Sequence, residues 1–393
     1  MLKFHLLTVS DVQPEAEDAL RLVLEVPPAL APLFRAKAGQ HVVLRRWVDD
    51  VEVRRTYSPT GEAGALPLTL GIRLQPGGRF SQHLARELHP GDAIEVMPPG
   101  GSFGAALAST GTSGATYVVF VAGSGITPVL SVIRTALAEQ DRARLIVFYG
   151  NRTAARAMFL EDLLALKDRY LGRLALHFIM SAEPQETELL NGRIDGTRAR
   201  ELARAFFDPL AVRAYFLCGP GDMMEQVGGA LRTIGVPSER IHAEHFTVEE
   251  RAVTSPAAAL TATTSAAAAA TATTSPAATT TAAAATPSPA AAAEERGQAG
   301  ITEVTVLMDG RRRSFTMRTG QETILDAAGR AGLELPYSCR AGVCSTCRTR
   351  LVRGKVDLRA NYSLEDWELE QGYILACQSH AVTSELELDY DAR

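Results

Sequence analysis

The sequence lacks any long hydrophobic run. Across 393 residues, no stretch approaches the roughly 18 uninterrupted apolar residues that a membrane-spanning helix needs. The N-terminal residues are soon followed by acidic ones, and they contain neither a long apolar region nor the small-residue cleavage site of a secretory signal. We therefore expect a cytoplasmic protein that has no membrane partner.

Cysteine is scarce, and the charge is not biased towards one sign. The chain has 5 cysteines, and all but Cys218 lie between Cys339 and Cys377. An odd, sparse set of this kind does not form a secreted disulfide framework, and in a cytosolic chain such a cluster more often binds metal. Lys and Arg number 40 against 45 Asp and Glu, a net charge of −5. This balance gives no electrostatic reason to expect binding to nucleic acid or to an anionic membrane.

Charged side chains are absent from residues 255–293. Every residue there is Ala, Thr, Ser or Pro except Leu260. Such a composition cannot bury enough apolar area to offset the entropy lost on ordering, and its prolines interrupt the alanine runs before a helix can propagate. We predict a linker over residues 251–298. It is either an inert insertion or a tether that lets the last domain reach two partners.

The rest of the sequence divides into three blocks. Residues 1–112 contain short alternating runs between Gly and Pro turns, which is typical of a small antiparallel β-barrel. Residues 113–250 alternate apolar strands with helical segments and predict a parallel α/β sheet. Residues 299–393 form a third, smaller block. The expected strands are 22–26, 40–45, 67–74, 93–97, 117–122, 144–149, 175–180, 214–218, 301–308 and 313–318, and the expected helices are 128–139, 159–170, 221–234 and 323–331.

Four cysteines carry the strongest chemical signal. Cys339, Cys344 and Cys347 form C-x4-C-x2-C, and Cys377 follows further along the chain. This is the plant-type spacing of a [2Fe-2S] cluster, in which four thiolates hold two irons and a tight loop supplies three of them. A zinc site with four cysteines is the alternative, but such sites usually contain two separated C-x2-C pairs.

The surrounding residues carry a resemblance. Pro336–Cys347 and Leu375–Gln378 resemble plant-type ferredoxins, especially ferredoxin domains fused behind flavin reductases. Gly354–Asp357, Asn361–Asp366 and Gly372–Ser379 resemble the reductase subunits of phenylacetyl-CoA epoxidase. The resemblance extends over nearly the whole chain outside the linker. It implies an α+β, β-grasp ferredoxin fold for the third block.

The first block contains a candidate flavin site. Arg55-Thr-Tyr-Ser58 matches the R-x-Y-S motif of the ferredoxin–NADP reductase superfamily. A permanent cation suits a phosphate, an aromatic ring can cover the isoalloxazine, and a hydroxyl can bond to flavin N5. Gly77 and Gly78 open an expected helix whose free N–H groups suit a pyrophosphate. In isolation, such an arginine and tyrosine are more often surface charge and core. The expected flavin-binding residues are Arg55, Tyr57, Ser58, Gly77, Gly78, Phe80 and Ser81, with FAD rather than FMN implied by resemblance.

The second block contains a candidate nicotinamide site. Strand 117–122 runs into Gly123-Ser-Gly-Ile-Thr-Pro128, a Gly-rich turn that lets phosphates approach the backbone at a helix N-terminus. It resembles the superfamily's own version, which implies that Thr127 lies near the nicotinamide. Cys218 and Gly219 resemble the C-G-P motif beside the hydride-transfer site, although a small buried hydrophobe is the alternative for Cys218. The expected nucleotide-site glycines are Gly123, Gly125 and Gly219.

Two further residues complete this site. Arg152 follows the second strand of the block and can pair with a 2′-phosphate, whereas no acidic residue stands at the strand end to favour a free ribose hydroxyl. This pattern favours NADPH, with NADH as the alternative, and an ordinary solvated arginine is the other interpretation. Phe246 ends an E-x-F sequence that resembles the family terminus, whose aromatic ring packs near the flavin.

The resemblance implies an electron-transfer chain. NAD(P)H reduces FAD, the [2Fe-2S] cluster receives the electrons singly, and a multicomponent di-iron oxygenase accepts them, namely phenylacetyl-CoA epoxidase of phenylacetate degradation. No general acid–base residue is expected. The reductase of another aromatic-ring or alkane oxygenase is one alternative, and a non-turnover redox carrier or sensor is another. Acidic residues between 360 and 392 are either a docking face for a basic partner or an ordinary solvated surface.

Overall fold

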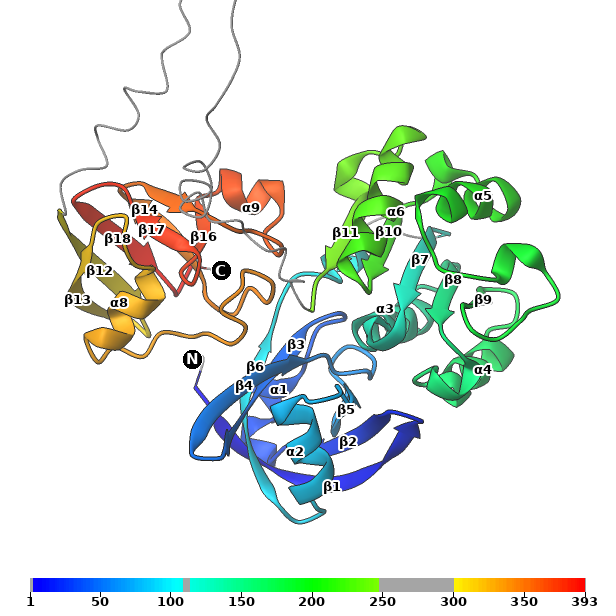
Figure 1. The fold of residues 1–393 in the computed structure, drawn as a ribbon, viewed down its shortest axis with the longest axis horizontal. Coiled ribbons are helices and arrows are strands. Elements are labelled where there is room, and N and C mark those ends of the chain that lie inside the picture. The colour runs from blue at the N-terminus through cyan, green and yellow to red at the C-terminus, as the bar shows by residue number, and fades with distance from the viewer. Residues whose placement is uncertain (1–2, 109–113, 247–299, 393) are drawn as a thin grey trace, which may run out of the picture.

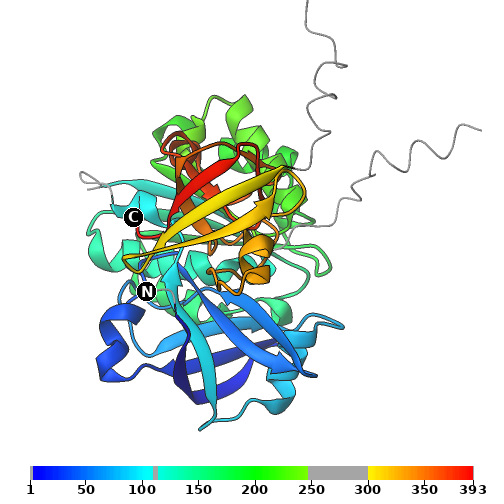
Figure 2. The same ribbon diagram turned by 90° about the vertical axis from the view of Figure 1, so that its left-hand side faces the viewer.

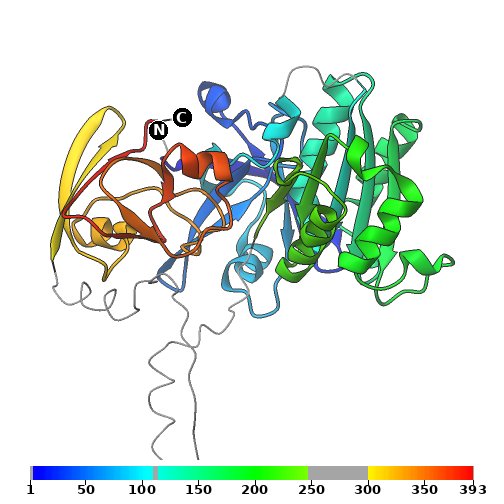
Figure 3. The same ribbon diagram turned by 90° about the horizontal axis from the view of Figure 1, so that it is seen from above.

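The computed structural model describes residues 3–108, 114–246 and 300–392, which form three units. Figure 1 shows the N-terminal unit below, the second unit on the right and the C-terminal unit at the upper left. Figure 2 shows the C-terminal unit above the N-terminal one, and Figure 3 shows the N-terminal unit between the other two. Within these ranges, no helix is long and apolar enough to cross a membrane.

The first unit is a six-stranded antiparallel sheet in the order β4-β3-β6-β1-β2-β5. Its two edges approach each other, because Pro59, just after β4, bridges to Leu70 of β5, and Thr60 N donates to Thr69 O at 2.9 Å. The sheet therefore curls into a barrel around a core that includes Leu24. Its elements are β1 (His5–Ala16), β2 (Ala19–Glu25), α1 (Ala31–Phe34), β3 (His41–Val48), β4 (Val51–Tyr57), β5 (Leu68–Arg73), α2 (Arg79–Glu87) and β6 (Ala93–Gly100).

The second unit is a five-stranded parallel sheet in the order β11-β10-β7-β8-β9. The chain leaves the central strand β7 in one direction towards β9 and then returns to its other side at β10. The carboxyl ends of β7 and β10 therefore form a topological switch point, the place where open α/β sheets bind ligands. The strands are β7 (Thr116–Ala122), β8 (Arg144–Asn151), β9 (Leu174–Met180), β10 (Ala214–Cys218) and β11 (Ile241–Glu244).

Helices cover both faces of this parallel sheet. Alternate residues of β7 point to opposite sides, so Val119 belongs to one core and Phe120 to the other. Ile133 of α3 packs in the first core, and Val227 of α6 packs in the second. Burial on both faces explains why the strands are almost continuously apolar. The helices are α3 (Ile126–Glu139), α4 (Leu160–Arg169), α5 (Gly196–Phe206) and α6 (Gly221–Thr233).

The third unit is a mixed five-stranded sheet in the order β13-β12-β18-β14-β16, with a separate β15–β17 pair. Strand β12 pairs antiparallel with β13 and parallel with β18. Ile324 and Ala328 of α8 are buried in the same core as Val304 of β12. The elements are β12 (Ile301–Met308), β13 (Arg311–Arg318), α8 (Ile324–Arg330), β14 (Arg348–Arg353), β15 (Val356–Leu358), α9 (Asp366–Glu370), β16 (Tyr373–Leu375), β17 (Ser379–Ala381) and β18 (Glu385–Asp389).

Two carboxylates join the first two units. Asp162, on α4, forms ion pairs with Arg21 of β2 and with Arg134 of α3. Asp18, between β1 and β2, forms ion pairs with Arg73 of β5 and with Arg156 of the second unit. Each carboxylate therefore holds one arginine from each unit.

Apolar packing supports these ion pairs. Gly71 of β5 leaves room for Phe159 of the second unit, because a Cβ at Gly71 would lie 2.5 Å from a ring atom of Phe159. The guanidinium of Arg21 lies 5.0 Å from the centre of the same ring. The interface thus combines charge pairing with close packing, which fixes the two units relative to each other.

The predicted fold class is confirmed: an antiparallel barrel, a parallel α/β sheet and an α+β unit follow one another. All ten expected strands and the four expected helices given by range correspond to observed elements, and the helix expected after Gly78 corresponds to α2. The prediction missed β1, α1, β4, α5 and β11, and in the third unit it missed β14 to β18 and α9. Strand β1 interrupts its alternation with polar residues, and β11 has only four residues, so neither gave a clear periodic signal. The predicted linker lies outside the described residues.

The replacement Asp162→Ala is expected to lower the melting temperature by about 5 °C. It leaves two partly buried arginines, Arg21 and Arg134, without their shared carboxylate, at a cost of about 2 kcal/mol. Glu161→Ala is the matched control, because Glu161 lies in the same first turn of α4, is exposed and has no ion pair among the described residues. Thermal unfolding followed by circular dichroism measures both. Equal melting temperatures for the two variants would contradict the role of Asp162.

Candidate functional site

The R-x-Y-S segment lies at the end of β4. Arg55 is exposed, and among the described residues its guanidinium donates only to the carbonyl oxygen of Arg54, at 2.8 Å. Tyr57 stacks against Phe80 of α2 with a centroid distance of 6.2 Å and an interplanar angle of 25°. The motif therefore presents a cation in solvent beside an aromatic ring that a second ring supports.

Ser58 provides a test of whether a flavin fits here. Ser58 is only 1% exposed, and its Oγ has no hydrogen-bond partner within the described part of the chain. A buried hydroxyl without a partner costs free energy, and such groups usually mark a site whose partner is a ligand or water. A ring nitrogen or carbonyl of an isoalloxazine would satisfy it. The segment therefore fits the group that the motif implies.

Gly77 and Gly78 form the entrance to α2. Gly78 is the N-cap, no side chain caps the helix, and its first turn contains no acidic residue, so the first N–H groups and the positive end of the dipole are available to an anion. Gly77 has φ +70°, and a Cβ there would meet nothing within 4 Å. These features fit a pyrophosphate approaching the backbone.

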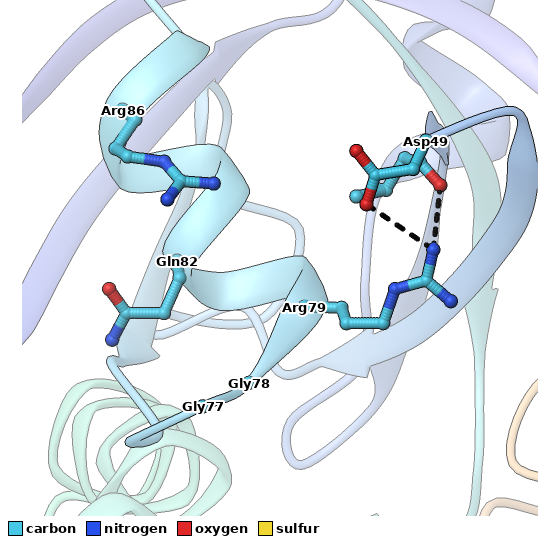
Figure 4. A pocket seen from close by; sticks show the side chains of 7 residues that line it. Asp49, Gly77, Gly78, Arg79, Gln82 and Arg86 are labelled. Atoms are coloured by element: carbon cyan, nitrogen blue, oxygen red, sulfur yellow. Dashed lines mark hydrogen bonds and ion pairs between the residues drawn. The ribbon is translucent and has the colours of Figure 1, made fainter.

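A cavity of about 430 Å³ lies beside this helix entrance. Figure 4 shows Arg79 reaching towards Asp49, and Gln82 and Arg86 on the following turns of α2. Arg79 donates to Val48 O at 2.9 Å and to Asp49 Oδ2 at 3.5 Å. These cavity side chains are not among the predicted flavin residues, although Arg79, Gln82 and Arg86 recur at helical spacing directly after the Gly pair.

Two predicted flavin residues lie behind this surface instead. Ser81 is buried, and its hydroxyl accepts a hydrogen bond from Gln75 N at 3.1 Å. Phe80 is 2% exposed and supports Tyr57. Neither residue lines the cavity, so their observed contacts close the loop and fix the motif.

The four predicted cluster cysteines come together in the third unit. Hydrogen bonds from the thiols of Cys344 and Cys377 hold the pKa of Cys339 far below its usual range, and the same bonds raise the pKa values of those two thiols. Cys377 also forms a hydrogen bond with Cys347. The four sulfurs are therefore connected into one group, as a two-iron cluster requires.

The loop backbone is shaped around these sulfurs. Arg340 and Ser345 have φ values of 56° and 49°, and the left-handed conformation is unusual for residues other than glycine. Ala341 N donates to Cys339 Sγ at 3.3 Å. Ser338 Oγ and Thr349 Oγ1 are buried without partners within the described ranges. Turned backbone, an N–H aimed at sulfur and hydroxyls in need of acceptors fit a sulfur-rich cluster.

No group of three or more His, Cys, Asp or Glu side chains in the described residues would hold a single metal ion. A [2Fe-2S] cluster divides its four thiolates between two irons, so it does not need three of them around one point.

A second cavity, of about 670 Å³, connects the flavin motif with the cysteine loop. Arg55, Gly77 and Gly78 line one side, and Ser338 and Cys339 line the other. Cys339 is the half-exposed member of the cysteine set, whereas the other three are buried. The candidate flavin site and the outermost cluster sulfur therefore share one space.

The predicted nucleotide residues meet at the switch point of the parallel sheet. A Cβ at Gly125 would lie 2.3 Å from the carbonyl oxygen of Cys218, so only glycine fits there. A Cβ at Gly219 would lie 3.2 Å from Ala122 N. Thr127 Oγ1 donates to Ser124 O at 3.1 Å, which closes the turn of Gly123–Gly125. The two loops predicted to bind the nucleotide are therefore in direct contact.

Cys218 ends β10 and is completely buried. Burial, with a smaller contribution from Glu244, raises the pKa of the Cys218 thiol, so it stays neutral. Glu244 lies opposite Cys218 on β11, and its Oε1 is 3.6 Å from Nδ1 of His41, on β3. Sequence analysis did not single out His41, which links the barrel to this end of the sheet. Phe246 packs against the core beside β10.

Arg152 lies just beyond β8, exposed and without an ion pair among the described residues. The sequence showed no acidic residue at this strand end. The structure brings one there from a later loop, because Glu183 Oε2 accepts a hydrogen bond from Ala154 N at 2.9 Å. Its sequence position, after β9, gave no signal of this proximity.

Four of the acidic residues near the C-terminus have basic partners within the protein. Glu368 is buried and pairs with Arg348, while Glu385 and Glu387 pair with Arg353 and Arg312. His242 bonds to Glu365 at 3.1 Å and lowers the pKa of that carboxyl. The interpretation as an open acidic docking face is therefore weakened by these internal partners.

Comparison with known families identifies all three units. The oxidoreductase FAD-binding domain matches residues 7–104, the oxidoreductase NAD-binding domain matches residues 120–228, and the 2Fe-2S iron-sulfur cluster binding domain matches residues 306–382. The predicted cofactor classes, FAD, a nicotinamide nucleotide and a [2Fe-2S] cluster, are thereby confirmed, and the protein is an oxidoreductase.

Whole-chain relatives share this organisation. One subunit of the 1,2-phenylacetyl-CoA epoxidase from Escherichia coli is 35% identical over 393 residues, covering 100% of this chain and 99% of the relative. The ferredoxin reductase component of 3-ketosteroid-9-alpha-monooxygenase from Rhodococcus rhodochrous is 30% identical, with 98% and 96% covered. The structure of phthalate dioxygenase reductase has the same fold, with a TM-score of 0.54 and 23% identity over 98% of each chain. This protein therefore belongs to the family of FAD- and NAD-binding oxidoreductases with a C-terminal [2Fe-2S] domain, which includes that 1,2-phenylacetyl-CoA epoxidase component.

Proposed function

We propose that the protein is the reductase component of a di-iron oxygenase that epoxidises phenylacetyl-CoA, and that it passes electrons to that oxygenase from NADPH. Similarity over the full length to a component of 1,2-phenylacetyl-CoA epoxidase supports this partner. The observation that carries the electron-transfer order is the cavity that Arg55, Gly77 and Gly78 share with Cys339. We place the complex in the cytoplasm.

The proposed domain division follows the three units. The FAD-binding barrel comprises residues 1–112, the NAD(P)-binding domain residues 113–250, the linker residues 251–298 and the ferredoxin domain residues 299–393. Each family match falls inside the corresponding range, which supports the division without fixing its boundaries.

FAD bound in the first domain would accept a hydride from NADPH and release the electrons singly to the cluster. The chain's own residues bind and orient the partners of this reaction. Arg55, the N–H group of Gly77 and the first N–H groups of α2 would balance phosphate charge, whereas the N–H of Gly78 already donates to Gln75 O at 2.9 Å. The unpartnered hydroxyl of Ser58 would donate a hydrogen bond to the flavin ring, and the ring of Tyr57 would cover one face of it.

In the second domain, the backbone at Gly123, Gly125 and Gly219 would admit the nucleotide. Thr127 would lie near the nicotinamide, and the ring of Phe246 would pack near the flavin. Cys218, kept neutral by burial, would place no negative charge beside the hydride-transfer site. Exposed Arg152 supports a 2′-phosphate partner and hence NADPH, whereas Glu183 nearby keeps NADH as the alternative.

The proposed cluster ligands are Cys339, Cys344, Cys347 and Cys377. Their mutual contacts and the turned backbone of the loop support this assignment. A reductase for a different oxygenase is the second candidate function, and the similarity to the 3-ketosteroid-9-alpha-monooxygenase component is the observation that favours it.

Cys344→Ser is expected to abolish the visible absorption of the cluster and to leave reduction of the flavin by NADPH in place, because the cysteine loop lies outside the first two domains. Absorption spectra during anaerobic NADPH titration measure both signals. Cys218→Ser serves as the control for loss of a cysteine and should retain the cluster spectrum. An intact cluster in the Cys344 variant would contradict the ligand assignment.

Arg55→Ala is expected to reduce the FAD content of the purified protein at least about fivefold, since it removes a charge-assisted contact to phosphate worth roughly 1–3 kcal/mol. Arg46→Ala is the matched control. Arg46 lies on the adjacent strand β3, and its side chain donates only to the backbone of Ala93 among the described residues. Flavin released by acid denaturation gives the occupancy. Equal occupancy in both variants would argue against a phosphate role for Arg55.

Reconstitution tests the proposed acceptor. The holoprotein, mixed with NADPH and the oxygenase subunits of phenylacetyl-CoA epoxidase, should support oxygen uptake that depends on phenylacetyl-CoA and yields its epoxide. The oxygenase component of 3-ketosteroid-9-alpha-monooxygenase provides the comparison. Turnover with the steroid oxygenase alone would replace the first proposal with the second candidate, and turnover with neither would contradict both.

A further inference from the structure

Arg54, the neighbour of the flavin motif, contacts the ferredoxin domain. Its side chain is only 4% exposed. Arg54 Nη2 lies 2.7 Å from Glu334 Oε1, and its guanidinium carbon lies 3.9 Å from the centre of the Tyr337 ring. A guanidinium at this distance over an aromatic face is attracted by the ring, and more strongly where water is excluded.

Glu52 of the barrel contacts both Arg54 and Tyr337. Glu52, two residues earlier on β4, accepts a hydrogen bond from Arg54 Nε at 2.7 Å, which fixes the direction of the guanidinium. Tyr337 OH donates to the same Glu52 carboxylate at 3.3 Å. We call Glu52, Arg54, Glu334 and Tyr337 the interdomain clamp.

A second cation faces the clamp. Arg45 Nη1 lies 3.6 Å from Glu334 Oε1, and Glu95 holds this guanidinium through two hydrogen bonds, of 2.9 and 2.7 Å. Phe4 packs beneath both guanidinium groups, 4.0 Å from that of Arg45 and 5.0 Å from that of Arg54. Glu334 therefore meets two prearranged positive charges.

The clamp is directly connected to the cluster loop. Tyr337 precedes the candidate ligand Cys339 by two positions, and both line the cavity that contains Arg55 and Gly77. Between Glu334 and Tyr337, Leu335 and Pro336 are buried. The position of the Tyr337 ring thus sets the position of Cys339 with little freedom in the intervening chain.

The strength of the clamp suits a contact that forms and separates. Glu334 is 66% exposed, and exposed ion pairs contribute little because water and salt screen them. The more buried part is the stacking of Arg54 on Tyr337. The ferredoxin domain also meets the second domain through His242 and Glu365, and through the rings of His245 and Tyr362 at 5.7 Å, but these contacts are not part of the cysteine loop.

We infer that the interdomain clamp positions Cys339 against the flavin site and thereby sets the rate of electron transfer from flavin to cluster, with Arg54 and Tyr337 as positioning residues. This inference rests on the proposed electron-transfer function. It adds a role for residues that bind neither the cofactors nor NADPH. The electrons come from flavin already reduced by NADPH, and the cluster takes up one in each transfer.

Glu334→Arg tests the inference without changing the flavin or nucleotide domain. A third cation beside Arg45 and Arg54 repels the loop, and we expect flavin-to-cluster transfer at least about tenfold slower in stopped-flow absorption at low salt. The rate of flavin reduction by NADPH should be unchanged. Glu370→Arg makes the same charge change at an exposed position of the ferredoxin domain that has no ion pair among the described residues, and it should transfer at the wild-type rate.

A second pair of variants tests the aromatic contact. Tyr337→Phe keeps the ring under Arg54, whereas Tyr337→Leu removes it, so the Phe variant should retain much more of the transfer rate. The cluster spectrum of each variant shows whether the loop still holds its cofactor. Small-angle X-ray scattering provides a readout independent of activity, because Glu334→Arg should increase the radius of gyration as the ferredoxin domain separates.

The outcomes are distinct. Slow transfer and a larger radius in Glu334→Arg, with both values unchanged in Glu370→Arg, support the clamp. Wild-type transfer in Glu334→Arg and Tyr337→Leu would overturn it while leaving the proposed function intact. A wild-type holoprotein whose cluster is not reduced after its flavin would instead contradict the proposed function itself.

Discussion

Two carboxylates shared between units hold the catalytic half of the molecule in shape. Asp162 and Asp18 each bind an arginine from the barrel and another from the parallel sheet. Removing either partner would leave charge in a partly buried interface, so the arrangement tolerates little sliding between the units. This end of the parallel sheet is thereby kept against the barrel, where Glu244 meets His41. Hydride transfer needs close and reproducible approach of two rings, and this interface provides the rigid frame for it.

The ferredoxin domain is attached in a different way. Its contacts with the other units are polar and aromatic, and they include exposed side chains such as Glu334 and Tyr362. Interfaces of this polar kind resemble those of transient complexes, for which relative motion is expected. One protein therefore combines a fixed junction, where a hydride is passed, with a weaker junction, where single electrons leave. The difference follows from the chemistry, since hydride transfer is more sensitive to orientation than electron transfer.

Sequence reasoning reached the features that depend on local spacing. The cysteine pattern, the Gly-rich turn before Thr127 and the apolar strands of the parallel sheet are visible because their meaning is contained within a few adjacent residues. The role of Arg54 could not be predicted from the sequence. Nothing in the residues around it sets it apart, and its partner Tyr337, far along the chain, reaches it only in the folded protein. Glu183 and His41 were missed for the same reason, since each acquires its partner only through tertiary folding.

The exposure of Cys339 has a consequence for electron flow through the cluster. This sulfur is the accessible one of the four, and it faces the flavin domain. An acceptor that approaches the same edge must displace the flavin domain. Reduction of the cluster by the flavin and its oxidation by the acceptor therefore compete for the same surface around Cys339. An acceptor that stayed bound would keep the flavin domain away from the cluster, and the cluster would then receive no further electrons. In such an arrangement, fast dissociation of the acceptor matters more than high affinity. The rate of electron flow through the cluster then depends on how quickly the flavin domain and the acceptor exchange at this surface.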